Sequence, residues 1–141
     1  MENEFKPTCI LIGIAGILLP LVLIPIVAVT GSSEVIEELA KLAVIYLIIF
    51  RLPATESKIF GSILFAVAYG ISETFFIASS MSSEAIPLVL SARFVFTIPM
   101  HIVTVLVVST FGAWRRYLLP LGFLIAVIIH TAFNYYAPGI V

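Results

Sequence analysis

The chain has 141 residues, of which 62% are hydrophobic and only 11% are charged, and its formal net charge is −1. Soluble domains are about half apolar and about one quarter charged, so the composition excludes an ordinary soluble domain and indicates a membrane protein. The absence of a basic patch argues against a nucleic-acid partner, and the single Cys9 excludes an intramolecular disulfide framework.

Five segments are long and apolar enough to cross a bilayer, which takes about 20 apolar residues for about 30 Å of hydrocarbon. They cover about residues 8–30, 33–52, 58–80, 85–113 and 117–138, and short breaks with turn-forming residues separate them. The sequence therefore predicts an all-α, polytopic membrane protein of about five transmembrane helices that form a single domain over residues 1–141.

The first segment has an apolar run that is too long for a signal peptide, so we expect it to be a true span. It contains Pro20 and Pro25. Because proline removes a helical hydrogen bond and clashes with the preceding turn, kinks are expected there.

The second segment begins with Glu37, Glu38 and Lys41. Acids near a helix N-terminus complement the helix dipole, which is the simplest interpretation. However, if they marked the water boundary, only about 14 residues would remain up to Phe50, or roughly 21 Å, which is too short to cross. Both carboxylates are therefore expected about 6 Å below the surface. Lys41 follows Glu37 by four residues, where an ion pair would lower the cost of burial.

The third segment carries Glu73 in mid-span, with no cationic residue nearby in the sequence. Ionisable groups inside spans cost about 2.5–3.5 kcal/mol each on insertion scales, so each one requires an explanation. A lone carboxyl would remain protonated and bond a backbone carbonyl. The alternative is that Glu73 belongs to a functional site.

Histidines occur in the fourth and fifth segments. Arg93, Thr97 and His101 recur every four residues and so share one helix stripe, as do His130 and Asn134. Arg93 alone could extend to the interface, whereas His101 has no such route. Two histidines and a glutamate on three different helices suggest a site.

Counting residues from the outer end of each helix places these groups, apart from His101, in one layer about 6–12 Å deep. His101 joins that layer only if the fourth helix crosses from near Arg93. In that case the residues before Arg93, in the 81–92 region, would form an interfacial or re-entrant stretch.

The basic residues outside the spans all fall on one side of a five-helix arrangement: Lys6, Arg51, Lys58, Arg115 and Arg116. This bias predicts a cytoplasmic N-terminus and an outside C-terminus, which puts the candidate site in the outer half of the membrane.

The motifs resemble those of PrsW-type intramembrane proteases, relatives of the CAAX-protease and bacteriocin-processing (CPBP) family. That pattern has an EExxK motif, a second motif with an acidic position, an Arg, Thr and His run, and a terminal HxxxN. Thr74 stands where the family usually has Asn. The matching positions in chain order are Glu37, Glu38, Lys41, Glu73, Arg93, Thr97, His101, His130 and Asn134.

The resemblance implies an intramembrane endopeptidase of the cell membrane that cleaves a membrane-anchored protein near the outer surface. It implies that Glu37 or Glu38 acts as a general base on water. Asn134 would donate a hydrogen bond to the oxyanion.

The same resemblance gives His101 and His130 the role of orienting that water or of binding a metal, with Glu73 as a third ligand or a supporting acid. A set of one glutamate and two histidines suits Zn²⁺, which commonly keeps three protein ligands and one water. A metal-free glutamate mechanism uses the same side chains, so the sequence leaves both open.

Three alternatives compete with this interpretation. Lines of glutamate and histidine also mark the proton or ion path of a coupled transporter. A membrane scaffold without catalysis would tolerate loss of the acids. A serine protease would use Ser72 in "GISE", although no histidine is placed by sequence to activate it.

Overall fold

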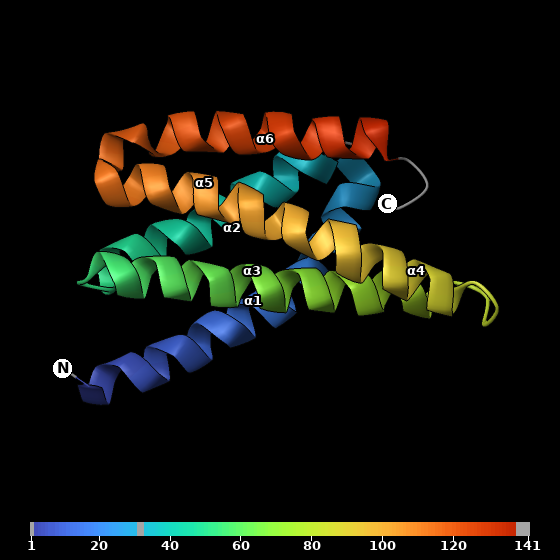
Figure 1. The fold of residues 1–141 in the computed structure, drawn as a ribbon, viewed down its shortest axis with the longest axis horizontal. Helices are drawn as coiled ribbons and strands as arrows, with labels where there is room; N and C mark the ends of the chain where they lie inside the picture. The colour runs from blue at the N-terminus through green and yellow to red at the C-terminus, as the bar shows by residue number, and fades with distance from the viewer. Residues whose placement is uncertain (1, 31–32, 138–141) are drawn as a thin grey trace.

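The computed structural model describes residues 2–30 and 33–137. These residues are mainly helical and contain no strand, which confirms the predicted all-α class (Figure 1). The elements in chain order are α1 (Glu2–Thr30), α2 (Ser33–Arg51), α3 (Thr55–Ser79), α4 (Ile86–Ala92), the π-helical segment η1 (Arg93–Thr97), α5 (Ile98–Trp114), the 3₁₀ turn η2 (Arg116–Leu118) and α6 (Leu119–Tyr136).

Four helical stretches among the described residues are long and apolar enough to cross a membrane, which agrees with the predicted polytopic membrane protein. The fifth predicted span, 33–52, coincides with α2, whose charged side chains set it apart from these four. The four stretches are Pro7–Val27, Thr55–Ser79, Ile86–Trp114 and Arg116–Tyr136.

The N-terminal half of helix α2 is polar inside and apolar outside. Glu38 and Lys41 are buried on a stripe that continues with Ile45, whereas Leu39 and Leu47 on the other side are 55% and 56% exposed. A helix on the surface of a soluble protein has the opposite arrangement. The exposed face of α2 is therefore suited to lipid, and its polar stripe packs against α1, α3, α5 and α6.

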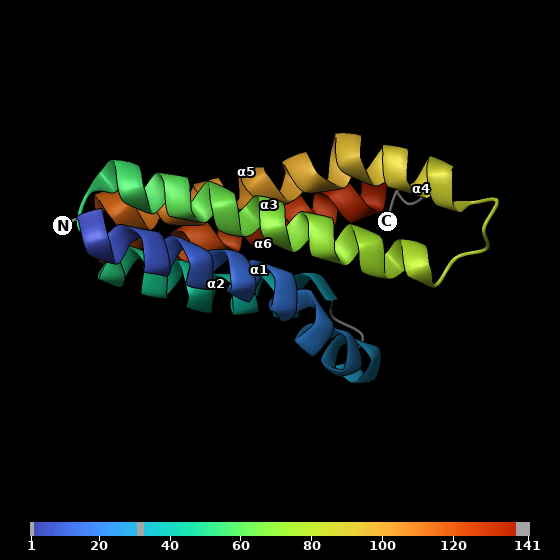
Figure 2. The same cartoon turned by 90° about the horizontal axis from the view of Figure 1, so that it is seen from below.

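Helix α1 packs mainly on α3. On its other side α3 packs on α5, which in turn packs on α6. At Gly16, α1 approaches α3 so closely that a Cβ atom would lie 2.8 Å from the carbonyl oxygen of Phe65. Small residues allow such contact between membrane helices. Figure 2 shows α1 bending in its C-terminal part, as expected from Pro20 and Pro25.

Aromatic residues mark the two ends of α6. Tyr117 and Tyr135 are both 76% exposed, and they are 18 positions apart, which corresponds to about 27 Å of helix, close to the hydrocarbon thickness. Because tyrosine favours the membrane interfaces, these residues indicate where α6 meets the headgroups. The α2–α3 connection, which follows Arg51, and the connection after α5, which contains Arg115, lie at the same end of the bundle as the N-terminus (Figure 1).

The stretch before Arg93 was predicted to be interfacial or re-entrant, and the re-entrant alternative is wrong. Helix α4, η1 and α5 form one helical run, Ile86–Trp114, that is long enough to span a membrane. The turn between α3 and α4 lies beyond the ends of α2 and α6 (Figures 1 and 2). Counting depth from the end of each helix assumed that these ends are level, so it misplaced His101.

Candidate functional site

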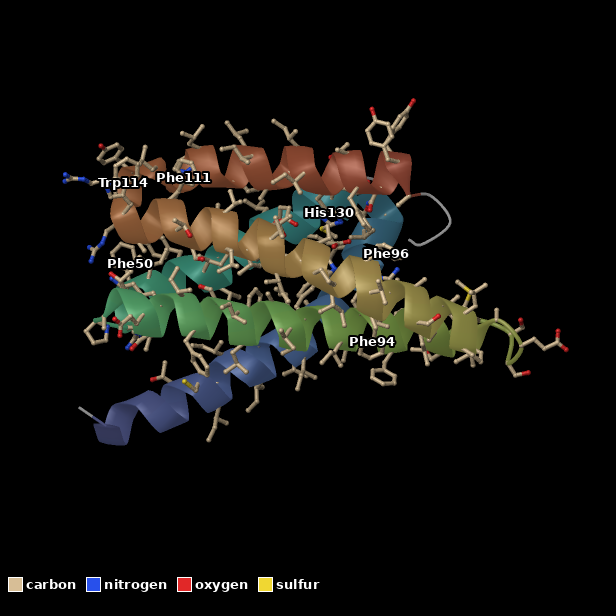
Figure 3. The ribbon with its side chains drawn as sticks, viewed as in Figure 1. Phe50, Phe94, Phe96, Phe111, Trp114 and His130 are labelled. Atoms are coloured by element: carbon tan, nitrogen blue, oxygen red, sulfur yellow. The ribbon has the colours of Figure 1, made fainter. Side chains whose placement is uncertain are left out.

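A continuous network of ionisable side chains connects five elements inside the bundle. Each member lies within hydrogen-bonding distance of the next, and all but Glu73 are at most 5% exposed. Figure 3 shows His130, at one end of the network, directed from α6 into the bundle. The network runs through His130, Glu38, Lys41, His101, Glu73 and Arg93.

Glu38 has two partners, both on one of its oxygens. Its Oε1 accepts a hydrogen bond from Lys41 Nζ at 2.8 Å and lies 2.9 Å from His130 Nδ1. Because an ionised carboxylate can only accept, Nδ1–H of His130 is the donor. The sequence predicted Glu37 as the partner of Lys41, but Glu37 Oε2 lies 4.0 Å from Nζ, so the ion pair with Glu38 is the shorter one.

His101 is held on both sides. Its Nδ1 lies 2.9 Å from Lys41 Nζ, and its Nε2 lies 2.5 Å from Glu73 Oε2. A charged ammonium group only donates, so Nδ1 accepts and Nε2–H donates to Glu73, which assigns a neutral imidazole in one tautomer. The ring also contacts Tyr69 edge-on, with centroids 5.0 Å apart, while Lys41 Nζ lies 4.6 Å from the Tyr69 centroid.

Glu73 is not a lone carboxyl. Its Oε1 accepts a hydrogen bond from Arg93 Nη2, and its Oε2 accepts one from His101. Both partners come from the following helical run, 20 and 28 residues further along the chain. The predicted stripe of Arg93 and His101 is thus confirmed, although its target was not predicted.

The π-helical turn η1 aligns Arg93 and His101 with Glu73. In a regular α-helix, eight residues turn about 80° beyond two full turns, and a turn that holds one extra residue removes most of this offset. The N–H of Ile98 bonds to the carbonyl of Arg93, five residues earlier. Pro99 follows immediately, and its missing N–H and its ring disfavour a regular turn at this point.

Glu37 differs from Glu38 in its surroundings. Glu37 Oε2 has no hydrogen-bond partner among the described residues, and it lies 4.0 Å both from Lys41 Nζ and from His130 Nε2. The side chain is 16% exposed, whereas that of Glu38 is completely buried. Glu37 therefore has a partly exposed side chain and a buried oxygen, Oε2, that no described donor occupies.

A cavity of about 260 Å³ leads to Glu37 between α1, α2 and α3. Its walls are apolar apart from Glu37, Glu73 and Tyr69, so two carboxylates face an otherwise hydrocarbon-like space. Residues 81–92 are not part of this cavity, whereas Pro20 of the bent α1 is. The lining residues are Pro20, Leu23, Ile24, Val27, Glu37, Tyr69, Glu73, Phe76 and Ile77.

Asn134 lies beside the network rather than in it. Its Nδ2 donates to Glu34 Oε1 at 3.0 Å. Helices α2 and α6 are therefore joined twice, by Glu38 with His130 and by Glu34 with Asn134, and on each helix the two positions are four residues apart. Glu34 was not among the predicted site residues, although this matched spacing was a signal for it.

The predicted metal ligands Glu73, His101 and His130 do not fit a metal ion in this arrangement. Both ring nitrogens of His101 already face protein partners, and no lone pair remains for a metal. Within residues 2–30 and 33–137, no group of three His, Cys, Asp or Glu side chains is arranged to hold one.

Ser72 is also engaged elsewhere. Its Oγ donates to the carbonyl oxygen of Ile17 in α1 at 2.6 Å. The described contacts of His101 and His130 do not include this hydroxyl. The geometry thus gives the serine-protease alternative no support.

Comparisons with protein-family models, curated proteins and solved structures give no match for this chain. The resemblance to PrsW-type proteases therefore depends on the motifs quoted above.

Proposed function

We propose that the chain is an intramembrane endopeptidase of the cell membrane that hydrolyses a peptide bond of a membrane-anchored protein near the outer surface. The observation that carries the proposal is the accessible carboxylate of Glu37 at an apolar cavity, next to Lys41 and His130. The order of the motifs along the chain supports the same class of enzyme. In this proposal the N-terminus is cytoplasmic, in accordance with the basic residues at that end.

Glu37 is the general base and Glu38 is a positioning residue. A base must reach the water whose proton it takes, and of Glu37, Glu38 and Glu73 only Glu37 combines a partly exposed side chain with an oxygen that no described donor occupies. Glu38 Oε1 is already bonded to Lys41 and His130. It therefore holds the side chains of these two residues in position next to Glu37.

In the proposed reaction, a water between Glu37 and His130 attacks the carbonyl carbon of the substrate. The 4.0 Å between Glu37 Oε2 and His130 Nε2 is a distance that one bridging water spans. Glu37 takes one proton as the C–O bond forms, and passes it to the amide nitrogen as the C–N bond breaks. The products are a carboxylic acid and an amine, and Glu37 returns to its initial state.

Charge that develops on the oxyanion is stabilised by the nearest cation, Lys41, whose ammonium group is held by Glu38 and His101. Arg93 and His101 keep Glu73 in place on the cavity wall. For Asn134 to donate to the oxyanion, as the resemblance implies, its amide would have to leave Glu34.

The proposal is tested by cleavage of a single-span reporter protein in liposomes. Glu37→Gln keeps the shape of the side chain but removes the base, so we expect cleavage to fall by about 10²–10⁴-fold with little change in thermal stability. Glu56→Gln is the matched control, because Glu56 is exposed at the opposite end of α3. It should cleave like the unaltered protein.

Further variants separate the remaining possibilities. Glu38→Gln should lower both activity and stability, since it weakens the contacts with Lys41 and His130. Ser72→Ala and addition of a chelator should leave cleavage intact. Loss of cleavage with chelator alone would instead favour the zinc mechanism. Full activity of both glutamate variants would contradict the proposed chemistry, and an unaltered protein that never cleaves would favour a scaffold or transporter.

A further inference from the structure

A second cavity, of about 490 Å³, lies between α1 and α2 at the end of the bundle opposite the candidate site. We call it the α1–α2 groove. Ile12 and Ile48 form its floor, with 6% and 2% exposure, and Leu11 and Leu47 on its edges are 66% and 56% exposed. It shares no lining residue with the cavity at Glu37.

Arg51 closes the groove at its polar end. It is exposed and forms no ion pair or hydrogen bond with any side chain that the structure describes. The other groove residues are apolar apart from Thr8. The groove therefore combines a hydrocarbon surface, about two helical turns long from Val44 to Arg51, with one positive charge at its end.

Further positive charges gather at this end. The guanidinium group of Arg116 lies 4.2 Å from the ring centroid of Phe50, the residue before Arg51. Lys58 lies in the first turn of α3, which also carries the exposed acid Glu56. Together these groups leave a surplus of positive charge where the apolar helices meet water.

We propose that the α1–α2 groove binds one acyl chain of an anionic phospholipid, whose phosphate pairs with Arg51. A lipid is the occupant that supplies both parts at the required spacing, since its chain begins directly beneath its phosphate. A guanidinium group binds phosphate through two parallel hydrogen bonds, and anionic headgroups attract basic residues next to a span. The site is independent of the proposed protease activity.

The test compares phosphatidylglycerol with phosphatidylcholine of the same acyl chains, added to the purified full chain in neutral detergent while thermal unfolding is followed. A ligand that binds the native state raises the melting temperature. We expect phosphatidylglycerol to bind about five-fold more tightly than phosphatidylcholine, the preference that one basic residue near a membrane surface provides. Arg51→Gln should abolish this preference, whereas Lys58→Gln, the matched control, should keep most of it, because Lys58 does not line the groove.

Two further arms examine the apolar part of the site. Val44→Phe fills the groove without changing its charge and should weaken the stabilisation by phosphatidylglycerol. Glycerol phosphate, which has the phosphate but no acyl chain, should not stabilise the protein. The proposal is overturned if Arg51→Gln keeps the preference, if Val44→Phe binds phosphatidylglycerol as well as the unaltered chain does, or if glycerol phosphate acts equally well.

Discussion

The two ends of the bundle are built on different principles, and α2 passes through both. Towards its N-terminus, the buried stripe of α2 contains Glu38 and Lys41, which join the ionisable network. Towards its C-terminus, the same stripe contains Ile45, Ile48 and Ile49, which pack in an apolar core. One helix face thus changes from charge to hydrocarbon within two turns.

The difference shows where each end obtains its stability and its specificity. The apolar end gains from close contact between side chains and tolerates replacements of similar volume. At the charged end, burial itself is costly, and each group is stabilised only by its partners. Substitutions there should therefore affect neighbouring groups, whereas those at the apolar end should act through volume.

The largest effect is expected from Lys41→Met. Lys41 is completely buried and contacts Glu38 and His101, so its loss leaves a buried carboxylate without its ion pair. Removing one partner of a buried pair typically costs about 3–5 kcal/mol. Unfolding in mixed micelles, followed by circular dichroism, measures this cost, and Lys58→Met at the basic end provides the same substitution at a position outside the network.

A double variant sharpens this result. Adding Glu38→Gln to Lys41→Met removes the unpaired charge and should restore part of the lost stability. A double variant that is less stable than Lys41→Met would contradict the assignment of Glu38 as the main partner of Lys41.

An intermediate effect is expected from Gly16→Ala in α1. The added methyl group would lie 2.7 Å from Ala68 Cβ and 2.8 Å from the Phe65 carbonyl oxygen, so α1 must move away from α3. Overpacking of this kind costs about 1–3 kcal/mol. Gly13→Ala, one turn earlier, meets nothing within 4 Å and should be neutral or stabilising. Equal stability of the two variants would show that the close contact is unimportant.

The smallest effect is expected from Asn134→Ala. It removes one hydrogen bond to Glu34, which is worth about 1 kcal/mol in a typical protein. Because Asn134 lies outside the network, reporter cleavage should fall by less than in Glu37→Gln. A loss as large as that of Glu37→Gln would mean that the amide does act on the oxyanion.

The sequence was sufficient for the features that depend on local pattern. Apolar runs predicted the helices, and four-residue spacing predicted the shared faces of Arg93 with His101 and of His130 with Asn134. The structure buries Glu38 and Lys41 of α2 inside the bundle, whereas the depth of about 6 Å below the membrane surface that the short apolar run indicates stays a prediction.

The pairing of groups on different helices was not predictable, because it depends on how the helices are tilted and staggered. Glu73 had no visible partner, since Arg93 lies 20 residues away on the next run. The choice of Glu38 over Glu37 by Lys41 depends on which side of α2 faces α5, and spacing alone does not determine it.

The π-helical turn at Arg93–Thr97 also makes the network sensitive to chain length. Removing one residue from this turn would give a regular α-helix, in which Arg93 and His101 are seven residues apart and stay within about 20° of alignment. Adding one residue between them would instead rotate Arg93 by about 100° relative to His101, away from their common partner Glu73. An insertion of this kind is therefore a change of register that side-chain substitutions at the site cannot mimic.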